Sequence, residues 1–153
     1  MLIALDDPGT PDVLALLEQH LADMHAESPP ESVHALDVAA LRAAHITFLT
    51  AREAEGALLG VGALSELAPN HGELKSMRTA PSARGRGVAT AMVNALLDLA
   101  RVRGYERVSL ETGSQAYFAA AHRLYERAGF VECGPFGRYV LDPNSRFFTL
   151  ELR

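Results

Sequence analysis

Apolar and polar residues in the first half of the chain follow a helical period after a short apolar start. Residues 2–5 predict a strand, and from Val13 to Met24 apolar side chains recur every three or four positions, as on one face of a helix. Pro11 fits the first turn of this helix, and Ser28-Pro29-Pro30 ends it. A weaker helical pattern follows over residues 33–41.

The middle of the chain carries the pattern of three neighbouring strands. Residues 46–52 and 57–67 are separated by a short polar turn and predict a hairpin. Asn70-His71-Gly72 predicts a further turn, after which residues 73–79 form the third strand. Regular alternation along this strand places four side chains on one face, namely Glu73, Lys75, Met77 and Thr79.

In the second half, helical and extended patterns alternate. One apolar stripe runs from Val88 to Leu99, with Gly104 suited to a left-handed cap, and another runs from Tyr117 to Ala128 and places His122 on the surface. Short strands are predicted at residues 108–110, 130–133 and 147–150. This order predicts an α/β (α+β) fold: a mixed, largely antiparallel sheet of six or seven strands with helices on both faces. The crossover within residues 73–111 should be parallel and right-handed.

Composition adds that residues 1–153 form one ordinary globular domain, with 48% hydrophobic and 22% charged residues. The single cysteine, Cys133, is expected to be a strand residue; it leaves no internal disulfide and fits a reducing compartment, so we expect a cytoplasmic protein. No apolar run approaches the ~18 residues of a membrane span, and the N-terminus lacks a signal pattern. No membrane partner is therefore expected.

Charge is unevenly distributed along the sequence. The net charge of −5 argues against general nucleic-acid binding. Residues 1–76 carry three basic and twelve acidic side chains, whereas residues 77–153 carry eleven basic and seven acidic ones. The second half is therefore suited to an anionic ligand and the first half tolerates a cation, although solvated faces alone also produce such a difference. The histidines do not have the spacing of a metal motif, so no metal is expected.

The segment with the clearest chemistry is residues 77–90, MRTAPSARGRGVAT, which leads from a predicted strand through a turn into a helix. Gly85 and Gly87 let a ligand approach the backbone closely. The first N–H groups of a helix lack intrahelical partners and carry the positive end of its dipole, so phosphate is the expected ligand. Arg84 and Arg86 add positive charge. The segment is neither a Walker loop nor a Rossmann fingerprint, since Thr90 stands where the latter has its third glycine.

Arg84-x-x-Gly87-x-Ala89 resembles the Arg/Gln-x-x-Gly-x-Gly/Ala pyrophosphate motif of the GCN5-related N-acetyltransferases (GNAT family). The resemblance extends to the strand Glu73–Arg78, to Leu110–Thr112 and to Leu124–Phe130, which is similar to the family's Leu-Tyr-Glu-x-x-Gly-Phe signature. Together these segments cover most of residues 57–135. The whole chain is similar to uncharacterised bacterial acetyltransferases of this size. The resemblance implies acetyl-coenzyme A (acetyl-CoA) as acyl donor and an amine as acceptor.

The resemblance also implies how the donor is bound. Backbone N–H groups of the pyrophosphate motif would hold the diphosphate, the preceding strand would pair with pantetheine, and an N–H at or near Arg78 would point at the thioester carbonyl. The residues expected to bind the donor are Met77, Arg78, Thr79, Arg84, Gly85, Arg86, Gly87, Val88, Ala89 and Thr90. Many family members have an asparagine where this chain has Phe118, so one pantetheine contact is missing or rebuilt.

Three residues are candidates for catalysis. Tyr125 matches the family tyrosine that protonates the leaving sulfur, a transfer that is nearly balanced because phenol (pKa ~10) and thiol (~8.5) are close. It also lies on the apolar stripe of its helix, so it could instead be only a core aromatic residue. Glu73 matches the family's frequent glutamate base, and Glu111 at the end of the neighbouring strand is the rival, acting directly or through water. Either carboxylate could instead serve only to pair with Lys75 or an arginine.

The acceptor site is expected between residues 28–34 and 135–145, whose side chains are polar. Arg138, Asn144 and Ser145 are candidates for binding a carboxylate of the acceptor, and Glu31 or His34 for binding its amine. Loop polarity alone explains these residues equally well.

The sequence thus predicts an N-acetyltransferase that transfers an acetyl group to a primary amine of a small molecule. Direct attack without a covalent enzyme intermediate is the expected mechanism. The alternatives are an inactive acyl-CoA-binding sensor and a protein or peptide N-acetyltransferase. A homodimer is compatible with such folds, and nothing in the sequence fixes an interface.

Overall fold

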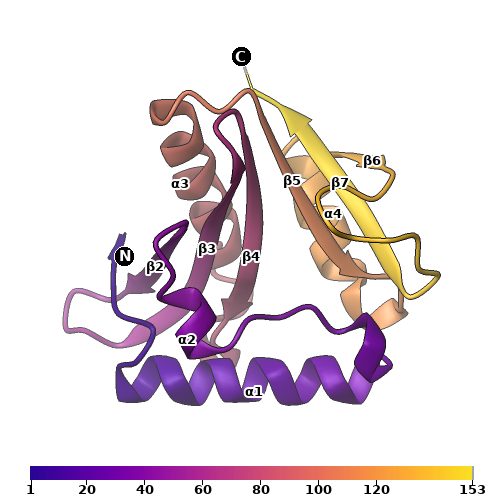
Figure 1. Ribbon diagram of the computed structural model, residues 1–153. Coiled ribbons are helices and arrows are strands. Elements are labelled where there is room, and N and C mark those ends of the chain that lie inside the picture. Colours follow the sequence, from indigo (N-terminus) through magenta and orange to yellow (C-terminus); the bar gives the residue numbers. More distant parts are fainter. Residues whose placement is uncertain (153) are drawn as a thin grey trace.

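The computed structural model describes residues 1–152 (Figure 1). Its centre is a seven-stranded sheet in the order β1-β2-β3-β4-β5-β7-β6, in which only the β4–β5 pair is parallel. The strands are β1 (Leu2–Leu5), β2 (Ile46–Arg52), β3 (Leu58–Ala68), β4 (His71–Thr79), β5 (Arg107–Gly113), β6 (Val131–Cys133) and β7 (Ser145–Glu151). The predicted mixed, largely antiparallel sheet is confirmed.

Helices cover both faces of the sheet, as predicted. The helices are α1 (Pro11–Glu27), α2 (Val38–Leu41), α3 (Val88–Val102) and α4 (Ala119–Arg127), with 3-10 turns at Pro30–Ser32, Pro81–Ala83 and Ala116–Phe118. Helices α3 and α4 pack on one face, where Met92, Leu96 and Tyr125 join the larger hydrophobic core. Helices α1 and α2 pack on the other face through a smaller cluster that includes Val13 and Leu41. Within residues 1–152 no helix is both long and apolar enough to cross a bilayer.

The two parallel strands separate in the middle of the sheet. Residues His71–Leu74 of β4 pair with Arg107–Leu110 of β5, and beyond them the strands diverge, as Figure 1 shows. Neither diverging half is left unpaired, because β4 continues against β3 and β5 continues against β7. The carboxyl ends of β4 and β5 therefore border an opening in the sheet, the position at which α/β folds commonly bind ligands.

A bulge in β4 changes which side chains share a face. Ser76 has a positive φ of 56°, and the register with β3 shifts next to it. As a consequence Met77 packs on the same core as Leu74, whereas Glu73 and Lys75 point to the face that carries α1. The sequence prediction of one shared face for these residues is wrong, because an extra residue in one strand reverses the alternation that follows it.

Three further sequence predictions differ from the structure. The helix expected over residues 33–41 is confined to Val38–Leu41, because the Asp37 carboxylate accepts a hydrogen bond from Ala40 N at 2.8 Å and caps the helix there. Strand β4 begins at His71 rather than at residue 73. His122, expected on the surface, is buried at 7% exposure. Its ring nitrogens are satisfied by the Gly113 carbonyl at 2.7 Å and the Arg146 guanidinium at 3.0 Å.

Candidate active site

The segment Arg84–Thr90, which we call the donor loop, offers main-chain N–H groups at the start of α3. Gly85 and Gly87 have φ of 76° and 79°, and a Cβ added to either would meet no atom within 4 Å. Gly87 is the N-cap of α3 and provides no side-chain cap. None of the backbone N–H groups of the donor loop donates a hydrogen bond to another group within residues 1–152. Consecutive unpaired amides at a helix N-terminus fit a diphosphate.

The arginines of the donor loop differ in their surroundings. Arg86 forms an ion pair with Glu53, which lies in the turn between β2 and β3. Arg84 makes no hydrogen bond or ion pair with the residues that the structure describes. The pKa of the Asp23 carboxyl in α1 is lowered, mainly by the hydrogen bond from Arg78. The positive charge of Arg84 lowers it further. Arg84 is thus the arginine available to an anionic ligand.

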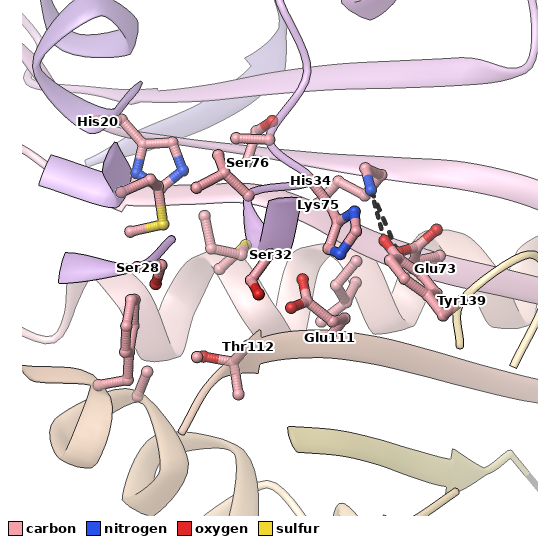
Figure 2. Close-up of a pocket in the computed structure, with 18 of the residues that line it drawn as sticks. His20, Ser28, Ser32, His34, Glu73, Lys75, Ser76, Glu111, Thr112 and Tyr139 are labelled. Atoms are coloured by element: carbon pink, nitrogen blue, oxygen red, sulfur yellow. Dashed lines mark hydrogen bonds and ion pairs between the residues drawn. The ribbon is translucent and has the colours of Figure 1, made fainter. Parts of the chain in front are cut away.

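A cavity of about 130 Å³ lies where β4 and β5 separate, and we call it the acceptor cavity (Figure 2). Its walls come from the end of α1 and the following loop, β4, β5, α4 and the loop between β6 and β7. It brings together all three candidate catalytic residues, Glu73, Glu111 and Tyr125, together with Met77 and His34. Because the sheet is open here, Tyr125 reaches the cavity from the α4 side while the two carboxylates line it from the α1 side.

Glu73 is held at one end of the acceptor cavity by two donors. The Tyr139 hydroxyl donates to Glu73 Oε2 at 2.5 Å, and the Lys75 ammonium lies 3.3 Å from the same oxygen. Lys75 Nζ also donates to Tyr139 Oη at 2.8 Å, so the three groups form a closed triangle (Figure 2). Burial and the charge of Glu73 both raise the pKa of Tyr139, which therefore stays a proton donor.

Glu111 has a different environment from Glu73. Its Oε2 accepts one hydrogen bond, from Ser145 Oγ at 2.8 Å. Burial raises the pKa of Glu111, and the Ser145 hydrogen bond and the nearby charges of His34 and Lys75 oppose that shift only in part. The cavity thus holds two carboxylates in different surroundings: Glu73 is hydrogen-bonded by Tyr139 and Lys75, whereas burial raises the pKa of Glu111.

Tyr125 is 6% exposed and packs edge-on against Phe130, with ring centroids 5.8 Å apart. Its hydroxyl makes no hydrogen bond with residues 1–152, although the residue lines the acceptor cavity. Burial raises the pKa of the phenol, so the hydroxyl is neutral at pH 7 but is a weaker acid than the free phenol considered in the sequence analysis. The residue is therefore part of the core and also faces the cavity, so the two roles considered from sequence do not exclude each other.

Two loops are joined across the acceptor cavity. Ser32, just after α1, donates to Asp142 Oδ2 at 2.6 Å. The rings of His34 and Tyr139 meet edge to face with centroids 5.0 Å apart. These contacts connect the segment that follows α1 to the loop between β6 and β7, so the cavity is closed on this side by side chains more than 100 residues apart in sequence.

The opposite end of the cavity holds buried polar atoms without partners. His20 Nδ1 and Ser76 Oγ make no hydrogen bond within the described chain, and both residues line the cavity (Figure 2). Burial lowers the pKa of His20 to about 4, with the positive charge of Arg78 acting in the same direction. His20 is therefore neutral at pH 7. Phe118, which replaces the family's asparagine, packs on Gly113 and makes this end more apolar.

The other residues predicted to bind the acceptor do not line the cavity, with the exception of His34. Ser145 acts on Glu111 rather than facing the cavity directly, and Asn144 accepts a hydrogen bond from Gln115 at 3.0 Å. Glu31 and Arg138 are exposed and do not line the cavity. The sequence interpretation missed Tyr139. In the polar loop 135–145 it selected the charged neighbour Arg138, although an aromatic side chain within a polar loop was a signal of an inward-facing position.

Known proteins are similar to this chain over most of its length. The family model described as "Acetyltransferase (GNAT) family" matches residues 13–130. An uncharacterized N-acetyltransferase, YedL of Escherichia coli K12, is 51% identical over 98% of this chain and 94% of the relative. YsnE of Bacillus subtilis 168, also named an uncharacterized N-acetyltransferase, is 49% identical over 99% and 100%. IAA acetyltransferase of Azospirillum brasilense is 37% identical over 98% and 97%.

Solved structures share the fold. An acyl-CoA N-acyltransferase from Klebsiella pneumoniae superimposes with a TM-score of 0.80 at 26% identity, covering 99% of this chain and 97% of the other. An aminoglycoside 6'-N-acetyltransferase solved in complex with coenzyme A has a TM-score of 0.72 at 16% identity, over 99% and 97%. The chain belongs to the GNAT family of acetyltransferases, so the resemblance seen in its motifs is confirmed.

Proposed function

We propose that this acetyltransferase moves the acetyl group of acetyl-CoA to a primary amine of a small molecule, by direct attack of the amine on the thioester. The proposal is supported by the presence of two sites in one fold, one suited to the donor and one suited to the acceptor. A run of unpaired amides suited to diphosphate starts α3, and a cavity with two carboxylates and a neutral phenol lies where β4 and β5 part. Such a reaction needs a neutral amine, a stabilised carbonyl oxygen and a protonated leaving sulfur.

Donor binding would use the main chain of this protein. The amides of the donor loop would receive the diphosphate, and Arg84 would add the charge that is free in this structure. The β4 residues beyond the bulge, Met77 to Thr79, border the opening and have no β5 partner, so their backbone is available to pantetheine. An N–H near Arg78 is the candidate donor to the thioester oxygen. The Arg78 side chain is engaged elsewhere, in an ion pair with Asp23.

Glu111 is the better candidate for the general base. A base works best when its pKa approaches the working pH, and burial moves Glu111 in that direction. Glu73 instead is already engaged by hydrogen bonds from Tyr139 and Lys75, so its Oε2 is occupied by partners of this chain. We assign to Glu73 the role of holding the incoming ammonium by charge, and to Glu111 the removal of its proton, directly or through water.

Tyr125 is the candidate general acid. Its raised pKa keeps the phenol protonated throughout the neutral range, and no protein acceptor within residues 1–152 competes for the proton. The cavity volume of about 130 Å³ is well below the roughly 300–1,000 Å³ of pockets that surround a whole ligand. We therefore expect the acetyl group and the amine-bearing end of the acceptor to enter, with the rest of a small molecule remaining at the rim.

The test is release of free coenzyme A thiol from acetyl-CoA across a panel of small amines, alongside calorimetry of coenzyme A binding. Tyr125→Phe should lower kcat about 100-fold without changing coenzyme A affinity, because loss of a general acid typically costs at least that factor. Tyr105→Phe is the matched control, since Tyr105 is buried on the same core but its hydroxyl binds Glu66 outside the cavity. Tight coenzyme A binding without thiol release from any amine would instead indicate a sensor, and release only with peptides would indicate a protein acetyltransferase.

A further inference from the structure

Lys75 is the only lysine in the sequence, against thirteen arginines. It does not lie on the surface, where lysine is usual, since its side chain is 12% exposed. It lies on β4 and lines the acceptor cavity together with Tyr125 and Glu111. A chain that uses arginine nearly everywhere thus places its one primary amine side chain inside the proposed acetyl-transfer site.

The contacts of Lys75 leave its ammonium group competent to react. An ammonium has three N–H donors, and Lys75 Nζ directs them to two described partners, Tyr139 Oη at 2.8 Å and Glu73 Oε2 at 3.3 Å. Glu73 is close enough to accept a proton from Nζ.

Arginine would serve a purely structural pair better than lysine does. A guanidinium binds a carboxylate in two places and is preferred in buried pairs, but it does not lose its proton at accessible pH. Lysine can lose its proton and become a nucleophile. A lysine at this position, in a chain otherwise rich in arginine, fits a requirement for that chemistry.

We propose that Lys75 is an internal acceptor: with acetyl-CoA bound and no amine substrate present, the enzyme acetylates its own Lys75. This inference rests on the proposed function. The bond from Lys75 Nζ to the acetyl carbon forms and the carbon–sulfur bond breaks. Of the two protons that leave the ammonium, one passes to Glu73 and on to solvent, and the sulfur receives its proton from Tyr125, which regains the second one. The products are an N-acetyl-lysine side chain and free coenzyme A.

Acetylation would alter the acceptor cavity. It removes the positive charge of Lys75 and its ion pair with Glu73, and it adds an acetyl group to a space of about 130 Å³. Modified enzyme should therefore bind an external amine poorly. Self-acetylation would then switch the enzyme off when donor is plentiful and acceptor is absent.

The test uses the full chain incubated with acetyl-CoA alone and then analysed by intact mass and tryptic mapping. We expect a gain of one acetyl group and, because trypsin does not cut after acetyl-lysine, a new peptide spanning residues 53–78 in place of a cut after Lys75. The rate should be independent of protein concentration, as for a reaction within one molecule. Lys75→Arg should abolish the modification, Tyr125→Phe should slow it about 100-fold, and Tyr105→Phe should leave it unchanged.

Two results would overturn the inference: acetylation confined to the Met1 amine, or modification of Lys75 at the same rate in the urea-unfolded chain. The inference also fails alone if amines release thiol from acetyl-CoA while Lys75 stays unmodified in their absence. If neither thiol release nor coenzyme A binding is detected, the proposed function itself fails. An external amine should protect Lys75 in proportion to its occupancy of the cavity.

Discussion

The donor loop and the acceptor cavity are built in opposite ways. The donor loop is seven consecutive residues whose useful groups are main-chain amides, and none of those amides has a partner within residues 1–152. The acceptor cavity is formed by side chains from segments far apart in sequence, and its charged groups are satisfied by one another, as in Glu73 with Tyr139 and Glu111 with Ser145.

This contrast has a physical reason. Amides at a helix start can remain unpaired because water reaches them until an anion arrives, so a local conformation is enough to make the site. A carboxylate inside a cavity has lost water and must be given donors by the protein, or it takes up a proton. The two carboxylates differ in their donors: Glu73 has Tyr139 and Lys75, whereas Glu111 has Ser145.

The largest effect is expected at the two carboxylates of the acceptor cavity. Glu111→Gln should lower kcat by about 100-fold or more and remove the fall of kcat/KM at low pH that a general base causes. Glu73→Gln should raise KM for the amine and keep that fall, because it removes a charge but not the base. Profiles of kcat/KM against pH for both variants test this. A wild-type acid limb in Glu111→Gln would assign the base elsewhere.

The next effect is on the free energy of unfolding, and it arises from His20, which lines the acceptor cavity. Burial lowers the pKa of His20 from 6.5 to about 4, a difference worth about 3 kcal/mol. Below pH 6.5 the unfolded chain takes up a proton that the folded chain refuses until about pH 4, so the free energy of unfolding should fall over this range as pH falls. His20→Gln should flatten this dependence in urea unfolding curves.

His25→Gln, on the exposed part of the same helix, controls for the loss of an imidazole as such. If His20→Gln and wild type lost stability equally between pH 6.5 and 4, the buried neutral state of His20 would be disproved. A second measurement, NMR titration of the His20 ring, reports the same quantity without unfolding.

The smallest effect tests the donor loop with two glycines at opposite ends of α3. Gly87 and Gly104 have φ of 79° and 78°, and a Cβ at either meets nothing within 4 Å. Alanine at each should therefore destabilise the fold similarly, by about 1 kcal/mol. Gly87→Ala should also weaken coenzyme A binding about tenfold, because the added methyl group stands where the diphosphate approaches the amides. Equal coenzyme A affinity of the two variants in calorimetry would contradict the assignment of the donor loop.

Features determined by neighbouring residues were predictable from the sequence. The stripes of α1 and α3, the β2–β3 hairpin, the left-handed Gly87 and Gly104, and the motif that identifies the family each depend on a few adjacent positions. Errors arose where a single local feature, a side-chain cap or a backbone bulge, interrupted a regular pattern. The Asp37 cap shortened the predicted helix at residues 33–41, and the Ser76 bulge reversed the face of Met77.

Which of the candidate residues contact one another depends on the folded chain. No spacing in the sequence shows that Tyr139 would bind Glu73, that Ser145 would serve Glu111, or that His122 would be buried against Arg146. Nor does it show that Lys75 would be enclosed with them. The chain by itself determined a helix start with vacant amides, since this needs only glycine and backbone geometry. The balance of protons in the cavity was decided by the folded molecule, because only burial and partners brought from distant segments fix the charge of a carboxylate.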